Sequence, residues 1–329
     1  MLETPKDHNA LASVAQVEPG ERSVEPARQA LGHAIARVNE LILGKSHQVR
    51  LAFACLLAGG HLLVEDLPGT GKTMLGRAMA SVLNLSFHRV QFTSDLMPSD
   101  ILGVSVFRPN TGEFELHKGP VFTNVLLADE INRASPRVQS ALLEAMAEGQ
   151  VSIDRQTLKL PVPFLVIATQ NPVDRVGTFP LPDAQMDRFL FQIEMGYPDR
   201  DSEIALMLGK SRNAMLEEAG KNGLSHLDLL CLRKAVADVT VSNDLAEYVY
   251  ALVSATRLHE GFETGLSPRA SLALVEAARA LAFLDGRCFV RPEDVQEAFL
   301  PMASHRISLR VSGSVVEHLQ GVLASVALP

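Results

Sequence analysis

A run of residues suited to bind phosphate lies near residue 70. It reads Glu65-Asp-Leu-Pro-Gly-Thr-Gly-Lys-Thr73, preceded by an apolar segment and followed by a helical pattern. A glycine-containing loop between a strand and a helix directs backbone N–H groups at an anion, and its lysine and hydroxyl reach phosphate oxygens and Mg²⁺. We therefore predict an ATP site with Thr73 as a metal ligand and nucleotide contacts from Pro68, Gly69, Thr70, Gly71, Lys72, Thr73 and Met74.

Asp66 departs from the usual pattern of such a loop, which has glycine five residues before Gly71. A plain glycine-rich turn is the alternative, but it would not require the Lys72-Thr73 pair. We keep the phosphate-loop prediction and expect Asp66 to alter the turn that enters the loop. Its effect on nucleotide affinity stays open.

Three more polar residues follow apolar runs. Val125-Leu-Leu-Ala-Asp129-Glu130 ends in two carboxylates, and Ala168-Thr-Gln-Asn-Pro172 places Asn171 after another run. Because the carboxyl ends of parallel strands share one sheet edge, these residues can reach the phosphate loop. We predict that Asp129 holds Mg²⁺ through water, that Glu130 polarises the attacking water and that Asn171 orients it. A solvated acidic turn and an Asn-Pro turn are the alternatives.

The elements that must position these residues are short apolar runs separated by helical or loop segments. Where the hydrophobicity is continuous, the strands are expected to be buried on both faces, as in a parallel sheet sandwiched by helices. The expected strands cover 61–65, 87–92, 121–129, 164–169 and 189–193. Helices are expected from Glu25 to near Gly44, over 46–58 and over 135–148, and hairpins at 104–116 and 149–160.

The pattern becomes entirely helical after Tyr197-Pro198. Ser242 caps one expected helix, and Pro268 and Pro292 begin two others. We therefore expect a disordered tail over 1–24, an α/β nucleotide-binding domain over 25–196 and an all-α domain over 197–329.

Composition excludes several classes of protein. The 329 residues carry 30 Lys and Arg against 38 Asp and Glu, a net charge of −8, with 5% aromatic residues and no Trp. This balance disfavours a nucleic-acid binder, so no nucleic acid is expected as a partner. The longest uncharged stretches, 51–64 and 160–173, are too short to span a bilayer, and no secretory signal is present, so we expect a cytoplasmic protein without a membrane span.

From about residue 25 to 329 the sequence resembles the AAA+ ATPases of the MoxR family. Besides the motifs above, the resemblance rests on the segments 91–101, 128–136, 181–189 and 267–270. It implies a P-loop NTPase core, an insert in helix two near 93–119 and an α-helical lid. It also implies a ring, usually of six copies, that hydrolyses ATP between subunits.

The resemblance assigns further roles at the site. Arg188 matches the arginine finger, which would reach the nucleotide of a neighbouring subunit. Arg133 and Arg137 compete for that role, and Arg188 could instead pair with Asp187 or cap the sheet edge. Arg269, in the first turn of a helix begun by Ser267-Pro268, resembles the second sensor, which reads the γ-phosphate of its own subunit.

Two more residues lie where related ATPases pack the adenine, namely Leu43 and Gly44. The alternative is that they only end a helix. Likewise Arg269 could be a solvated surface residue, and the two hairpins, expected to face the ring pore or a partner, could be plain surface loops.

In function, the resemblance implies chaperone-like remodelling or maturation of a partner protein complex, often one with a von Willebrand factor A domain. A nucleotide-gated scaffold with incidental turnover is one rival. A DNA helicase motor is another, which the acidic balance opposes.

Overall fold

The computed structural model describes residues 24–329 apart from 68, 155, 173–176, 210–211, 221–222 and 311. Residues 1–23 of the tail expected over 1–24 therefore lie outside the described residues. Its last residue, Val24, begins helix α1. Within the described chain, no helix is long and apolar enough to cross a bilayer.

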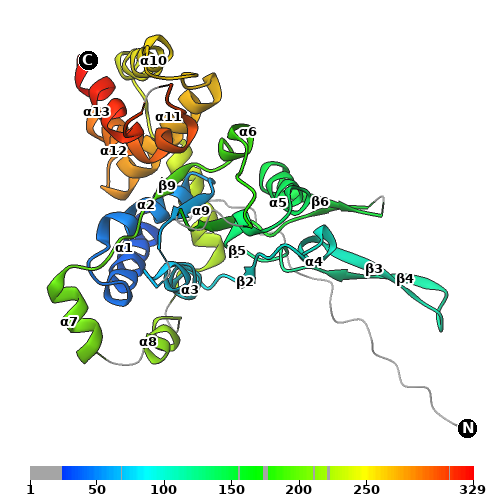
Figure 1. Ribbon diagram of the computed structural model, residues 1–329. Coiled ribbons are helices and arrows are strands. Elements are labelled where there is room, and N and C mark those ends of the chain that lie inside the picture. The colour runs from blue at the N-terminus through cyan, green and yellow to red at the C-terminus, as the bar shows by residue number, and fades with distance from the viewer. Residues whose placement is uncertain are drawn as a thin grey trace, which may run out of the picture.

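A parallel five-stranded sheet forms the centre of the molecule (Figure 1), in the order β2-β5-β8-β1-β9. Its strands are β1 (Leu62–Glu65), β2 (Phe87–Gln91), β5 (Val125–Asp129), β8 (Leu165–Gln170) and β9 (Phe191–Ile193). All five expected strands are present. The third begins at Val125 rather than at residue 121, because residues 121–124 form turns closed by bonds such as Phe122 N to Gly119 O.

The continuous apolar runs of β1, β5 and β8 are buried on both faces of the sheet, as expected, whereas the edge strand β2 is partly exposed. In β5, Val125 and Leu127 face one core cluster and Leu126 and Ala128 the other. The first cluster is built with helices α1 (Val24–Leu41), α2 (Ser46–Leu57) and α3 (Lys72–Val82). The second is built with α4 (Pro98–Leu102) and α5 (Pro136–Glu148), while the 3₁₀ turn η1 (Ile131–Arg133) precedes α5.

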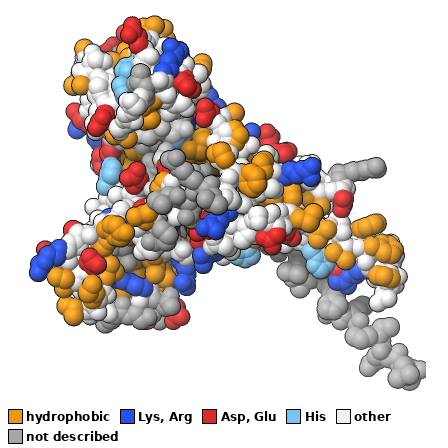
Figure 2. Space-filling view, in the orientation of Figure 1, with side chains coloured by type: hydrophobic (Ala, Val, Ile, Leu, Met, Phe, Trp, Pro, Cys, Tyr) orange, Lys and Arg blue, Asp and Glu red, His pale blue; other side chains and the backbone are white. Residues whose placement is uncertain are grey.

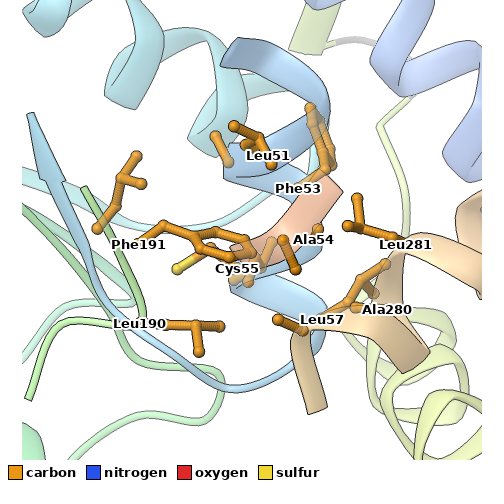
Figure 3. Close-up of a cluster of buried hydrophobic side chains, with 14 of the residues drawn as sticks. Leu51, Phe53, Ala54, Cys55, Leu57, Leu190, Phe191, Ala280 and Leu281 are labelled. Carbon is orange, nitrogen blue, oxygen red and sulfur yellow. The ribbon is translucent and has the colours of Figure 1, made fainter. Parts of the chain in front are cut away.

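Helix α2 is buried on almost every side. Residues 51–57 are all buried, with Phe53 and Cys55 fully enclosed. Figure 3 shows this helix between Phe191 of the sheet and Leu281 of the C-terminal helices. One hydrophobic cluster thus continues from the sheet into the C-terminal part, so the boundary at 197 marks a change of pattern and not a gap in the core.

Two antiparallel hairpins extend from the sheet on the side away from the C-terminal helices (Figure 1). One pairs β3 (Gly103–Arg108) with β4 (Glu113–Lys118), and the other pairs β6 (Gln150–Ile153) with β7 (Gln156–Lys159). Both match expected hairpins. Apolar side chains gather at the far end of the first (Figure 2), where Phe107 and Phe114 are exposed and in ring contact.

Beyond β9 the chain is helical, as predicted, apart from isolated bridges. Ser242 and Ser267 cap α10 and α11 by accepting from Leu245 N and Ala270 N. The elements are α6 (Asp183–Met186, before β9), α7 (Arg200–Leu208), α8 (Arg212–Ala219), α9 (His226–Ala237), α10 (Asn243–Leu258), α11 (Pro268–Leu284), α12 (Pro292–Ala303), η3 (Ser304–Arg306) and α13 (Val315–Ser325).

Candidate functional site

A cavity of about 430 Å³ lies at the carboxyl ends of the sheet strands, beside the N-terminus of α3. It is lined by parts of the glycine loop and by the ends of β2, β5 and β8. The structure thus brings together eight of the predicted residues, namely Gly69, Gly71, Lys72, Thr73, Met74, Asp129, Glu130 and Asn171.

The glycine loop has the backbone shape that the sequence indicates. Gly69 and Gly71 have φ angles of 86° and 97°, which side chains beyond glycine rarely adopt. Lys72 begins α3, and its Nζ donates to Asp66 O and Leu67 O, each at 2.8 Å. Burial lowers the pKa of Lys72, while nearby carboxylates raise it. The ammonium is thus turned back toward the loop in this structure.

Asp66 links the loop to the start of the helical region. Its Oδ2 accepts from Gly196 N at 2.6 Å, and its Oδ1 accepts from Leu67 N at 2.6 Å. Asp66 is buried, so these charge-assisted bonds compensate its desolvation. The departure from glycine therefore provides a tether between the phosphate loop and residue 196, where the pattern turns helical.

Both oxygens of Asp129 are engaged. Thr169 Oγ1 donates to Oδ1 at 2.6 Å, and Arg89 donates to Oδ2 from Nε at 3.1 Å and Nη2 at 2.6 Å. An oxygen donor set of Thr73 and Asp129 suits Mg²⁺, which prefers hard oxygen ligands completed by phosphate and water. A guanidinium on Asp129 shows that this position suits a cation.

Glu130 is held at the cavity by its neighbours. Its Oε2 accepts from Gln91 Nε2 at 2.9 Å and pairs with Arg133 Nε at 2.8 Å. Its backbone has φ 58°, an unfavourable region for glutamate, and its N–H donates to Thr169 Oγ1 at 2.9 Å. Sparsely populated backbone conformations of this kind concentrate at functional sites.

Some cavity residues escaped the sequence analysis: Arg77, Arg89, Gln91, Thr169 and Gln170. Thr169 and Gln170 lie within the motif 168–172 and could have been predicted as site residues from it. Arg89 and Gln91 required knowledge of which strand neighbours β5, since Gln91 lies opposite Asp129 in the register.

Several predicted residues lie elsewhere. Within the described part of the chain, Leu43, Gly44, Thr70, Arg188 and Arg269 do not line the cavity, and Pro68 lies outside the described residues. A Cβ on Gly44 would be 2.8 Å from Ser202 Oγ at the start of α7. Arg269 approaches Asp187, with Nε 3.8 Å from Oδ2. Arg133, a rival finger, contacts Glu130 of its own chain.

Comparisons with known proteins agree with this geometry. Residues 61–191 match the ATPase family associated with various cellular activities (AAA), and residues 254–318 match the AAA lid domain. The chaperone MoxR1 of Mycobacterium tuberculosis is 40% identical over 99% of this chain and 90% of its own, and the uncharacterized protein YeaC of Bacillus subtilis is 45% identical over 85% and 87%.

Among solved structures, that of an ATPase candidate from Cytophaga hutchinsonii has a TM-score of 0.85 and 37% identity, covering 93% of this chain and 97% of that one. The chain belongs to the MoxR family of AAA+ ATPases. The predicted family and fold class are therefore confirmed.

A buried arginine of this MoxR-family ATPase also escaped the sequence analysis. Arg306 Nε donates to Asp187 Oδ1 at 2.8 Å, and its terminal nitrogens donate to the carbonyls of Phe189, Leu190, Met302 and Asp187. Burial lowers its pKa, opposed by the Asp187 carboxylate. Arg306 thus fastens η3 to the backbone on both sides of Arg188.

Proposed function

We propose that this chain is a Mg²⁺-dependent ATPase that acts in a ring, at sites shared between subunits, and remodels a protein partner. One observation carries the proposal. A single cavity at the sheet edge holds the glycine loop, Lys72, the Asp129-Glu130 pair and Asn171. Phosphate binding, metal binding and water activation need these residue types at one place.

Binding of the phosphates falls to the loop and the start of α3. Gly69, Gly71 and Lys72 line the cavity, where loop N–H groups and the positive end of the α3 dipole would attract an anion. Lys72 would leave the carbonyls of Asp66 and Leu67 and turn its ammonium to the β and γ phosphates. Thr73 and Asp129 would hold Mg²⁺, which supplies charge neutralisation at the phosphates when bound.

Water activation falls to Glu130 and Asn171. Glu130 would accept a proton from the attacking water while Asn171 holds that water and a γ-phosphate oxygen. In this structure Gln91 and Arg133 occupy one oxygen of Glu130. These contacts would have to loosen before Glu130 could act as a base.

The ring is proposed on the basis of family and of the position of Arg188. Arg188 does not line the cavity of its own chain, as expected of a residue that would act on a neighbour's nucleotide. Six subunits are usual for the family. We propose that Arg188 acts in trans and that Arg269, once released from Asp187, reads the γ-phosphate in cis. Leu43 and Gly44 would pack the adenine.

Remodelling of a partner is proposed because a relative over nearly the whole chain is described as a chaperone. The shared hydrophobic cluster and Arg306 connect the helical lid to the sheet, so motion at the cavity would be transmitted to the lid. A protein with a von Willebrand factor A domain is the class of partner we propose. The exposed apolar hairpin β3–β4 is a surface that such a partner or client could contact.

A nucleotide-gated scaffold is the remaining alternative of another class. It predicts that Glu130→Gln keeps biological activity, whereas remodelling driven by hydrolysis predicts trapped ATP and lost activity.

A helicase motor predicts that DNA stimulates the ATPase and binds with a strong salt dependence. DNA that does neither removes that rival.

Steady-state ATPase activity against protein concentration tests the proposal, with and without Mg²⁺. The single variants are Lys72→Ala and Arg188→Ala. A third sample mixes the Arg188→Ala protein with the Glu130→Gln protein, and Arg200→Ala is the surface control. We expect turnover per subunit to rise with concentration, to need Mg²⁺ and to fall at least 100-fold in Lys72→Ala and Arg188→Ala.

Partial recovery in the mixture would establish a shared site, because each variant supplies what the other lacks. Turnover independent of concentration, with Arg188→Ala as active as wild type, would refute the role of Arg188 in trans. Absence of turnover with and without Mg²⁺ would favour the scaffold.

A further inference from the structure

Arg89 is a cavity residue whose position the proposed function leaves unexplained. It lies on β2, two residues before Gln91, and directs two nitrogens at one oxygen of Asp129. That carboxylate is the one proposed to hold the metal shell. A cation of the protein therefore contacts the carboxylate that would hold a metal ion through water.

The contact extends to the second acidic residue. Arg89 Nη2 also donates to Gln91 Oε1 at 3.1 Å, and Gln91 Nε2 donates to Glu130 Oε2 at 2.9 Å. One guanidinium thus influences the metal-binding carboxylate directly and the water-activating carboxylate through Gln91. Release of Arg89 from Asp129 would also loosen the support of Glu130.

The electrostatics of the site account for this arrangement. The Asp129 side chain is only 12% exposed, so its charge needs a nearby cation, while Arg89 is 48% exposed and can swing out at low cost. Lys72 does not supply this cation by direct contact, because its ammonium bonds to the Asp66 and Leu67 carbonyls. Arg89 is therefore the closest cationic partner that the described residues give Asp129.

We propose that Arg89 is a placeholder cation: it neutralises Asp129 in the metal-free site and must leave before a metal ion binds there. The inference rests on the proposed function, since it concerns the same Mg²⁺–ATP site. It makes Arg89 a positioning residue that couples the arrival of the metal to the release of Glu130. A bound metal ion, held through water, and the guanidinium would compete for the Asp129 carboxylate.

The test is nucleotide affinity with and without metal, measured by anisotropy of a fluorescent ATP analogue in excess Mg²⁺ and in EDTA. Arg89→Ala should bind the nucleotide roughly tenfold more tightly in Mg²⁺, because no guanidinium competes for Asp129. It should bind more weakly in EDTA, where the Asp129 carboxylate, now without its guanidinium partner, repels the phosphates. The dissociation constant in EDTA divided by that in Mg²⁺ should therefore be at least tenfold larger for Arg89→Ala than for wild type.

Two further variants sharpen the test. Arg89→Lys keeps a cation on β2 and should restore part of the wild-type ratio, and Arg200→Ala removes the same charge from an exposed site and should leave the ratio unchanged. Thermal unfolding gives a second readout. Arg89→Ala should lower the Tm of the nucleotide-free protein, and this difference should vanish with Mg²⁺ and the analogue bound.

A ratio that stays constant or falls in Arg89→Ala would overturn the placeholder role, since Arg89 would then be a lasting ligand of the bound nucleotide or a bystander. A Tm difference between Arg89→Ala and wild type that grows when Mg²⁺ and the analogue bind would also overturn the placeholder role. Failure of the wild-type protein to bind the analogue in either condition would instead refute the proposed ATP site. The two failures are thus distinguishable.

Discussion

Replacement of Arg306 tests whether one buried side chain holds the lid to the sheet. The Arg306 side chain is 5% exposed, and its guanidinium pairs with Asp187 and donates to the backbone carbonyls of Phe189, Leu190 and Met302. Arg306→Met keeps much of the side-chain volume but removes every donor. The variant leaves the Asp187 carboxylate without its near partner and removes a donor from the Leu190 and Met302 carbonyls, whereas the Phe189 carbonyl keeps His305 Nε2 at 2.9 Å.

The cost can be worked from these contacts. Removing one member of a buried ion pair costs about 3–5 kcal/mol, and each stranded carbonyl about 1 kcal/mol or more. Against this, Asp187 is 23% exposed and keeps Arg269 at 3.8 Å, and the variant no longer pays to bury a guanidinium. We expect the free energy of unfolding to fall by about 4 kcal/mol, a large part of the ~5–15 kcal/mol typical of a domain.

Urea denaturation followed by circular dichroism measures this change, with the exposed Arg200→Ala expected within about 0.5 kcal/mol of wild type. Adding Asp187→Asn to Arg306→Met should recover about 1–2 kcal/mol, because the stranded charge disappears. A single variant within about 1 kcal/mol of wild type would refute the reasoning. The lid would then be held by apolar packing alone.

Two further predictions concern buried polar groups. Burial lowers the pKa of His61 to about 4, below the ~6.5 of an unfolded chain, so its stabilising contribution is complete above pH 6.5 and is lost as pH falls toward 4. His61→Asn should reduce the pH slope of the unfolding free energy in that window by about 1.4 kcal/mol per unit, and an unchanged slope would contradict it. Asp66→Gly should lower the unfolding free energy by about 2 kcal/mol through loss of the Gly196 tether, whereas a urea midpoint equal to wild type would show that the tether contributes nothing.

The sheet and the phosphate loop were predictable because they depend on local patterns. Continuous apolar runs such as 125–128 indicate strands buried on both faces, and the loop before Lys72 has a fixed spacing. Proline and serine likewise marked the first turns of α10, α11 and α12. The start of β5 was misplaced by four residues because Val121 and Phe122, although apolar, lie in turns.

Contacts between residues far apart in the sequence were not predictable in this way. Arg89 contacts Asp129 only because β2 and β5 are neighbours in the sheet, and Arg306 reaches Asp187 across 119 residues of sequence. Each contact is fixed by the tertiary arrangement and leaves no local signal. The roles proposed for Arg188 and Arg269 depend further on contacts with a neighbouring subunit and on the position of the lid.

Asp187 joins these two kinds of information. It precedes Arg188 in the chain, bonds to the buried Arg306 and lies 3.8 Å from Arg269. If Arg269 leaves Asp187 to meet a γ-phosphate, Arg306 still holds the backbone on both sides of Arg188, so the finger keeps its place while the sensor moves. If the proposed roles hold, a single carboxylate would separate a fixed residue, Arg188, that acts on the neighbour from a mobile residue, Arg269, that senses its own nucleotide. Loss of Arg306 should accordingly impair hydrolysis at the neighbouring site before it impairs nucleotide binding at its own.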